Sequence, residues 1–196
     1  GAQRKPVALL DELGWGESHI GIMAFPSGME AGTPLADIVP DTDYLIDIDN
    51  KSITHRPDLW GHYGFARELA AIYGAELKPL PVVDRSNWAH LDAFPVRIDD
   101  LESCPGYSCL DIAGLRKDYA PLPLQYRLLA IGLRPINLIV DLTNYIMCEL
   151  GQPMHAFDGE RVRDIIVAPF GSDDTFRTLD SIDRKMRSDD LMIKDH

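Results

Sequence analysis

The sequence predicts an α+β fold in which mixed sheets pack against helices. Helical and strand periodicities are both present, but they do not alternate as βαβ units, which argues against a doubly wound parallel sheet. The 196 residues, 45% of them hydrophobic, suffice for one large or two small globular domains with a real core. A proline-rich stretch at residues 79–88 is the best linker candidate, and it divides the chain into residues 1–79 and 80–196.

The part before the linker is predicted to form a small strand-loop-helix element. Apolar and polar side chains largely alternate over residues 44–49, as in a half-buried strand. Asp58 follows a proline and is a candidate helix N-cap. Apolar residues then recur at helical spacing over residues 62–73, and Gly74 stands where a C-capping glycine is expected.

The part after the linker is predicted to hold two helices and several short strands. Pro121 and Pro123 open the first helix and Gly132 closes it, whereas Asn137 caps a second helix over residues 138–150. Residues 175–186 are typical of a hairpin that turns around residues 180–183. The other strands are predicted at residues 96–98, 107–112, 164–168 and 191–195.

Composition and charge narrow the classes of function. The chain has a net charge of −12, which argues against general nucleic-acid binding, and it contains no apolar run long enough for a membrane span. Three cysteines without a CxxC pair favour a reducing, cytoplasmic compartment. Four basic residues between 114 and 140 could still form a local RNA contact or be ordinary surface charge: Arg116, Lys117, Arg127 and Arg134.

The helix predicted at residues 138–150 is apolar nearly all round, so we expect it to be largely buried. A narrow polar stripe runs along it, because Asn137, Asp141, Asn144 and Cys148 are spaced four, three and four residues apart. Buried polar groups must be hydrogen-bonded. The stripe therefore either ties neighbouring backbone together or lines a polar pocket, which Thr143 could border.

His155 lies in the loop after this helix, stiffened by Pro153. His155 could belong to a polar pocket, or it could simply hydrogen-bond a backbone carbonyl. In the same loop, the amide of Gln152 could have a purely structural role by tethering the backbone. No HExxH motif, GxSxG elbow, Walker loop or GxGxxG motif is present, so a catalytic metal, a serine hydrolase and nucleotide binding are not indicated.

Three blocks resemble a known family. RPINLIVDLTNYIMCELGQPMHAFD is similar to the signature of the B3/B4 domain of the bacterial phenylalanyl-tRNA synthetase β subunit. IDIDNKSITHRPDLWGHYGFARELAAIYG resembles the segment just before that domain, with His55 where the family has asparagine. TLDSIDRKMRSDDLMIKD also fits, with Ser181 and Ile182 replacing a glycine turn. The resemblance covers residues 14–196; it assigns 1–79 to the end of a B1-like region and 80–196 to the B3/B4 domain, truncated at its C-terminus.

The resemblance implies a part of phenylalanine–tRNA ligase, an aminoacyl-tRNA synthetase that uses ATP and Mg²⁺. The family's B3/B4 domain edits: it hydrolyses mischarged Tyr-tRNA(Phe). Carried over by motif, Thr143, Asn144 and His155 are its pocket residues, with His155 the catalytic candidate. The implied partners are the acceptor end of tRNA(Phe) and the synthetase α subunit, which contacts parts of β outside this chain. For the chain alone the resemblance implies no cofactor, no metal, no membrane and no aminoacylation.

One departure from the family pattern leaves alternatives open. The family's pocket is completed by a glycine-rich segment and an acidic residue downstream of residue 196, so the pocket is expected to be incomplete in this chain. A non-catalytic scaffold module of the β subunit and a free-standing trans-editing protein are the competing interpretations. The β-type block before the domain favours a β-subunit fragment over the free-standing protein.

Overall fold

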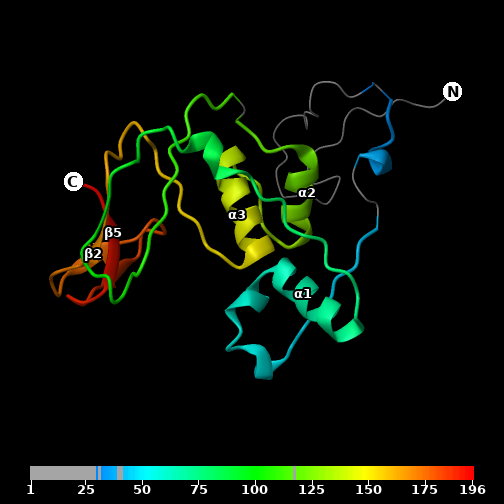
Figure 1. The fold of residues 1–196 in the computed structure, drawn as a ribbon, viewed down its shortest axis with the longest axis horizontal. Coiled ribbons are helices and arrows are strands. Elements are labelled where there is room, and N and C mark those ends of the chain that lie inside the picture. Colours follow the sequence, from blue (N-terminus) through cyan, green and yellow to red (C-terminus); the bar gives the residue numbers. More distant parts are fainter. Residues whose placement is uncertain (1–29, 31, 39–41, 117) are drawn as a thin grey trace. The chain divides into compact units, whose positions relative to one another are not determined.

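The chain forms two compact units, which interleave along the sequence. The computed structural model describes residues 30, 32–38, 42–116 and 118–196. Unit 1 comprises residues 1–79 and 116–156, and unit 2 comprises residues 80–115 and 157–196 (Figure 1). The first boundary coincides with the linker expected from sequence, but residues 116–156 pack with the N-terminal part. The division into family domains at residue 80 stays a prediction.

The regular elements in the described part of unit 1 are all helical. Helix α3 packs against α1, α2 and a short 3-10 turn before α1. In the described ranges, no helix is long and apolar enough to cross a membrane. The elements are α1 (His62–Tyr73), α2 (Leu122–Ala130), α3 (Leu138–Leu150) and the 3-10 turns Leu35–Asp37, Lys51–Ile53 and Pro57–Trp60.

Helix α2 begins and ends as its sequence predicts. Pro121 is the N-cap and Pro123 follows in the first turn, where a missing N–H costs nothing. Gly132 adopts a left-handed φ of 83°, and its N–H donates to Leu129 O at 2.9 Å. This is the C-terminal glycine motif that satisfies the last carbonyls of a helix.

Helix α1 ends as predicted but begins differently. Gly74 adopts φ 63° at the C-cap, and its N–H donates to Ala70 O. Asp58 is not the N-cap: it lies inside the 3-10 turn Pro57–Trp60, and Gly61 is the N-cap of α1. The carboxylate of Asp58 instead accepts hydrogen bonds from the side chains of Arg56 and Arg67.

Two predicted strands are absent from the structure. Residues 44–49 and 107–112 form neither strand nor helix, and Tyr44, Leu45 and Ile46 are 75–89% exposed. Alternating side chains favour a strand only where a neighbouring strand satisfies the backbone N–H and C=O groups. None of the described residues pairs with either segment in a ladder.

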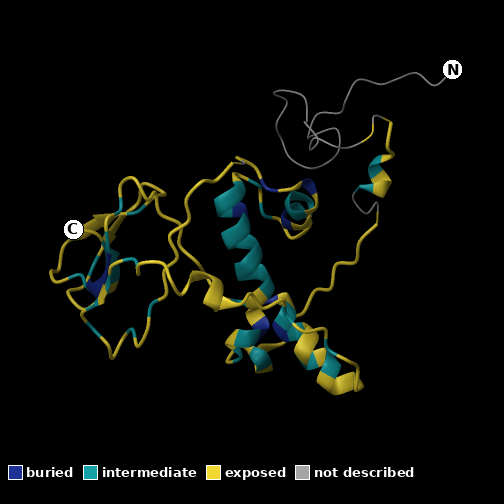
Figure 2. Ribbon diagram, turned by 45° about the horizontal axis from the view of Figure 1, so that its top comes forward, coloured by how far each residue is buried: buried dark blue, intermediate teal, exposed yellow. Residues whose placement is uncertain are grey.

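Unit 2 is built on a mixed three-stranded sheet with the order β1-β2-β5. Strand β1 (Val96–Ile98) pairs in parallel with β2 (Ile165–Pro169), and β5 (Leu191–Lys194) pairs antiparallel with the other edge of β2. All three strands were predicted. The central strand is almost completely buried from Ile165 to Ala168, as a continuous apolar run in mid-sheet should be (Figure 2).

The predicted hairpin is confirmed as the antiparallel pair β3 (Thr175–Arg177) and β4 (Asp183–Lys185). Its turn contains Ser181 with φ 63°, a left-handed conformation that glycine adopts more readily. Ser181 is one of the two residues that replace the glycine turn of the family. With both helices and sheets in the described residues, the α+β class is confirmed.

Candidate functional site

The sequence-predicted site is centred on α3, whose two ends are fixed by its flanking residues. Asn137 is the N-cap, and its Oδ1 accepts from Val140 N at 3.0 Å. At the other end Gly151 adopts φ 74° and donates its N–H to Met147 O at 2.8 Å. Both caps stand where the sequence predicts them, and the helix bounds 138–150 agree.

Helix α3 is half-buried, not largely buried as its apolar composition predicts (Figure 2). Within the helix only Asp141 is fully buried, and Leu150 is 39% exposed. Helices α1 and α2 pack against it, but their contacts leave every residue other than Asp141 partly exposed. The apolar side chains of this helix therefore stay partly accessible.

Asp141 ties the start of α3 to the loop before it. The side chain is 1% exposed, and its Oδ1 accepts from Ile136 N at 2.7 Å. Its Oδ2 is buried and has no hydrogen-bond partner among the described residues. One half of the predicted polar stripe, Asn137 and Asp141, thus bonds to neighbouring backbone, which is the first of the two roles considered for it.

The three residues assigned to the pocket all lie in unit 1. Thr143 donates its hydroxyl to Val140 O at 2.9 Å within α3, which leaves the hydroxyl lone pairs able to accept. Asn144 is half-buried on the next position of the helix, and His155 is exposed in the segment after Gly151. An amide that donates and accepts and an imidazole can both contact a polar substrate. The pocket role of the three side chains stays a prediction.

Sequence reasoning missed a tight contact between the start of α1 and the end of α3. His62 Nδ1 donates to Cys148 O at 2.8 Å. Gly61 is buried, and a Cβ placed on it would lie 2.4 Å from Gly151 N. The two glycines belong to two different sequence blocks, and nothing local in either block indicates that they meet.

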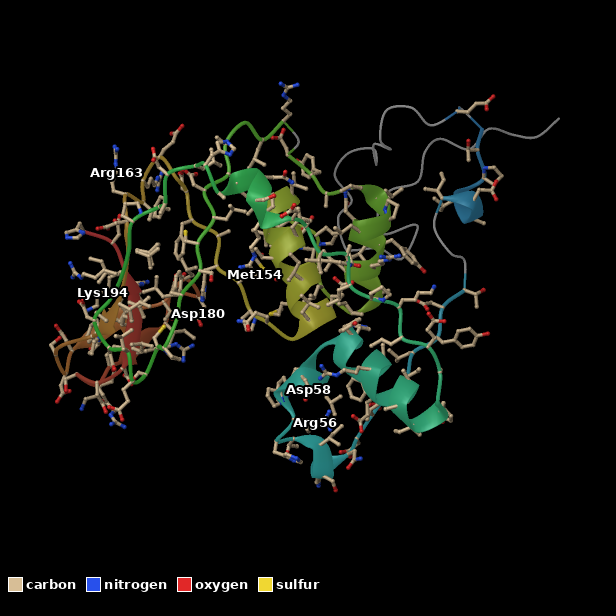
Figure 3. All side chains as sticks on the ribbon, viewed as in Figure 1. Arg56, Asp58, Met154, Arg163, Asp180 and Lys194 are labelled. Atoms are coloured by element: carbon tan, nitrogen blue, oxygen red, sulfur yellow. The ribbon has the colours of Figure 1, made fainter. Side chains whose placement is uncertain are left out.

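A cluster of charges fixes the turn before α1 (Figure 3). Arg56 donates to both carboxylate oxygens of Asp58, at 2.8 and 2.7 Å, and to Glu68 at 3.0 Å. Arg67 donates to Asp58 at 2.6 Å. The guanidinium of Arg56, with that of Arg67, holds the pKa of Asp58 well below its usual range. These bonds tie the turn to the helix that follows it.

The predicted basic patch is only partly described. Arg116, Arg127 and Arg134 are exposed, and Lys117 lies outside the described residues. Arg127 donates to the phenol of Tyr145 at 3.1 Å, so part of its hydrogen-bonding capacity is used within the unit. An RNA contact at these residues stays a prediction.

A shallow, mostly apolar cavity of about 410 Å³ lies along α1 and residues 75–78. Neither Thr143, Asn144 nor His155 lines it. Among the described residues, no group of three or more histidine, cysteine or acidic side chains could hold a metal ion.

The sequence matches one known protein family and is similar to several curated proteins. Residues 103–196 match the family described as the B3/4 domain. Over 94% of its length the chain is 45% identical to the phenylalanine–tRNA ligase beta subunit of Solibacter usitatus, of which it covers 24%. The corresponding subunits of Porphyromonas gingivalis and Salinibacter ruber are 42% and 37% identical, over 94% of this chain and 23% of theirs. The chain thus spans about a quarter of the length of the curated relatives it matches.

Proposed function

We propose that this chain is a segment of a phenylalanine–tRNA ligase β subunit and that it carries part of an editing pocket. Residues 103–196 match the B3/4 domain, and 94% of the chain is similar to one segment of such subunits. The pocket hydrolyses Tyr-tRNA(Phe). The single observation that supports this most is the similarity over 94% of the chain. In the complete ligase, the partners are the α subunit and the acceptor end of tRNA(Phe), and ATP and Mg²⁺ serve the charging step.

Physical chemistry explains why such an enzyme needs a second site. An apolar pocket rejects a substrate with one added hydroxyl by only about 10²-fold, so a site for phenylalanine admits tyrosine. A second site with buried polar groups that bond the phenol rejects phenylalanine, because those groups would be left unpaired. In the reaction, water attacks the ester carbonyl and the bond to the ribose oxygen breaks. Free tyrosine and tRNA with its hydroxyl restored are the products.

The arrangement around α3 supports the roles of the three residues. Asn137, Asp141 and Gly151 fix both ends of the helix, so Thr143 and Asn144 sit on a rigid element. We assign these two to holding the acceptor adenosine and the ester. His155 is exposed, and histidine is the side chain that most often acts as a general base, so it is the candidate that takes the proton of the attacking water. Alternatively, it only donates a hydrogen bond to the sugar or ester.

The test is single-turnover deacylation of Tyr-tRNA(Phe) by the intact ligase carrying His155→Ala in its β subunit. General-base catalysis is worth about 10²–10⁴-fold, so a loss in that range with normal phenylalanine charging is expected. A loss of about tenfold without a change in the pH profile points to hydrogen bonding alone. His90→Ala is the matched control, because His90 is exposed and lies in unit 2. Unchanged deacylation in His155→Ala would reject the editing role of this residue.

The second candidate function is a structural scaffold within the β subunit. It is favoured by the bond of His62, which ties the start of α1 to the end of α3, and by the bonds of Asn137 and Asp141, which fix the start of α3. The two functions separate in a variant with Thr143→Val and Asn144→Ala. The scaffold function leaves deacylation intact in this variant, whereas the editing function loses it without losing charging. A free-standing editing protein differs from both, because the 196-residue chain alone would then deacylate Tyr-tRNA(Phe).

A further inference from the structure

The first turn of α1 is joined to the last turn of α3 by direct backbone contact. We call this contact the glycine junction and define it by Gly61, His62, Cys148 and Gly151. All four residues belong to unit 1, and α1 packs against α3. The segment that carries His155 begins immediately after Gly151, so the junction lies at the base of that segment.

Glycine is required at the centre of the junction for steric reasons. A Cβ on Gly61 would lie 2.4 Å from Gly151 N and 2.6 Å from Leu150 C, which is closer than van der Waals contact allows. A Cβ on Gly151 would lie 3.1 Å from Pro57 O. The obstructing atoms are backbone atoms, which cannot rotate away as the end of a side chain can. The position of α3's last residue is therefore set by residues 57–61.

A hydrogen bond from His62 further restrains the end of α3 at this contact. The last carbonyls of a helix have no partner within the helix. His62 supplies one for Cys148 O through its Nδ1–H, at 2.8 Å. The turn that presents these groups is itself rigid: Arg56 and Arg67 bind Asp58, and a Cβ on Gly64 would overlap Asp58 O at 1.7 Å.

We propose that Gly61 and His62 are positioning residues for the hydrolysis of Tyr-tRNA(Phe). They fix where α3 ends and hence where the segment 152–155 begins, and so they place His155 relative to Thr143 and Asn144. This inference rests on the proposed function. A displacement of about 1 Å in a reacting group can cost 10²-fold in rate, so a junction remote from the ester can control the reaction.

Three variants of the intact ligase test the junction. His62→Leu removes the donor and is expected to lower the single-turnover deacylation rate about tenfold, with an unchanged KM for Tyr-tRNA(Phe). His62→Asn restores most of the rate, because an asparagine amide can donate from nearly the position of Nδ1. Gly61→Ala forces the backbones apart and is expected to lower the rate about 100-fold. Gly159→Ala is the matched control: nothing lies within 4 Å of its added Cβ, and the rate should not change.

The outcomes separate this inference from the proposed function. If His155→Ala loses deacylation while His62→Leu and Gly61→Ala match Gly159→Ala within twofold, the junction has no positioning role and the editing proposal stands. If His155→Ala has no effect, the assignment of His155 itself fails. If His62→Leu lowers phenylalanine charging as much as deacylation, or His62→Asn restores nothing, the junction only holds the fold together and the inference is overturned.

Discussion

Strand β2 and helix α3 both have strongly apolar sequences, but they differ in how they are buried. In β2, Ile165 and Val167 are each 2% exposed, and the strand has a hydrogen-bonded neighbour on both sides. In α3 the apolar side chains are half-exposed, and the one fully buried residue is Asp141. The strand forms the hydrophobic core of its unit, whereas the helix is fixed at its ends by polar and backbone contacts.

The difference shows that apolar composition does not identify the core of this protein. A continuous apolar run in a mid-sheet strand predicts burial of both faces of that strand, because successive side chains point to opposite faces. A helix is covered only where a neighbour packs, and α1 and α2 leave α3 partly exposed. An element that is rigid at both ends and accessible between them is suited to present side chains such as Asn144 to a ligand.

The largest expected effect contrasts the two elements directly. Ile165→Ala should destabilise the protein by about 3 kcal/mol, because it leaves a cavity in a fully buried position. Ile146→Ala on half-buried α3 should cost about half as much. Ile112→Ala is the matched control, because Ile112 is 55% exposed, and it should cost less than about 0.5 kcal/mol. Urea unfolding followed by circular dichroism measures all three, and equal losses for Ile165 and Ile146 would contradict the contrast.

A smaller effect is expected at the polar anchor of α3. Asp141→Ala should cost about 1–3 kcal/mol, because Ile136 N–H loses its buried acceptor. Asp141→Asn should cost less, since the amide oxygen can still accept and the amide nitrogen replaces the unpartnered Oδ2. The same unfolding experiment compares the two variants. An asparagine variant as unstable as the alanine variant would show that the carboxylate acts through something other than this bond.

The smallest effect concerns the charge cluster before α1. Arg56 and Arg67 depress the pKa of Asp58 in the folded chain. The unfolded value is about 3.9, so the stability that this carboxylate contributes is present above that pH and is lost as pH falls toward the folded pKa. Asp58→Asn should therefore flatten the acid limb of a stability-versus-pH curve below about pH 4. An unchanged limb would show that the arginines stabilise Asp58 equally in the unfolded chain.

Elements with local signals were predictable from the sequence. The bounds of α3 follow from Asn137 and Gly151, which act through bonds to residues three or four positions away. The hairpin and the central strand β2 have equally local patterns. The strand predicted at residues 44–49 failed because a strand depends on a partner elsewhere in the chain. Asp58 failed as the cap of α1 because it lies inside a 3-10 turn that ends before the helix, and Gly61 takes the cap position.

The residues of the candidate site also fall into those that the sequence predicted and those that it did not. Thr143, Asn144 and His155 were selected by motif resemblance, and the structure places them in one unit without testing their roles. Asp141 was anticipated as a buried polar residue that ties backbone, and its bond to Ile136 N agrees. Gly61 and His62 were missed, because their partners lie 86 or more positions further along the chain.

Because the two units interleave along the sequence, their segments leave the ribosome in alternation. Residues 1–79 belong to unit 1, residues 80–115 to unit 2, residues 116–156 to unit 1 and residues 157–196 to unit 2. Strand β1 precedes its partner β2 by roughly 70 residues, which is several seconds at about 5–20 residues per second. Unit 1 can close first, with β1 held unpaired in a loop. A chain translated only from residue 80 would contain all three strands of this sheet, but its α3 would be made without α1 to anchor its end.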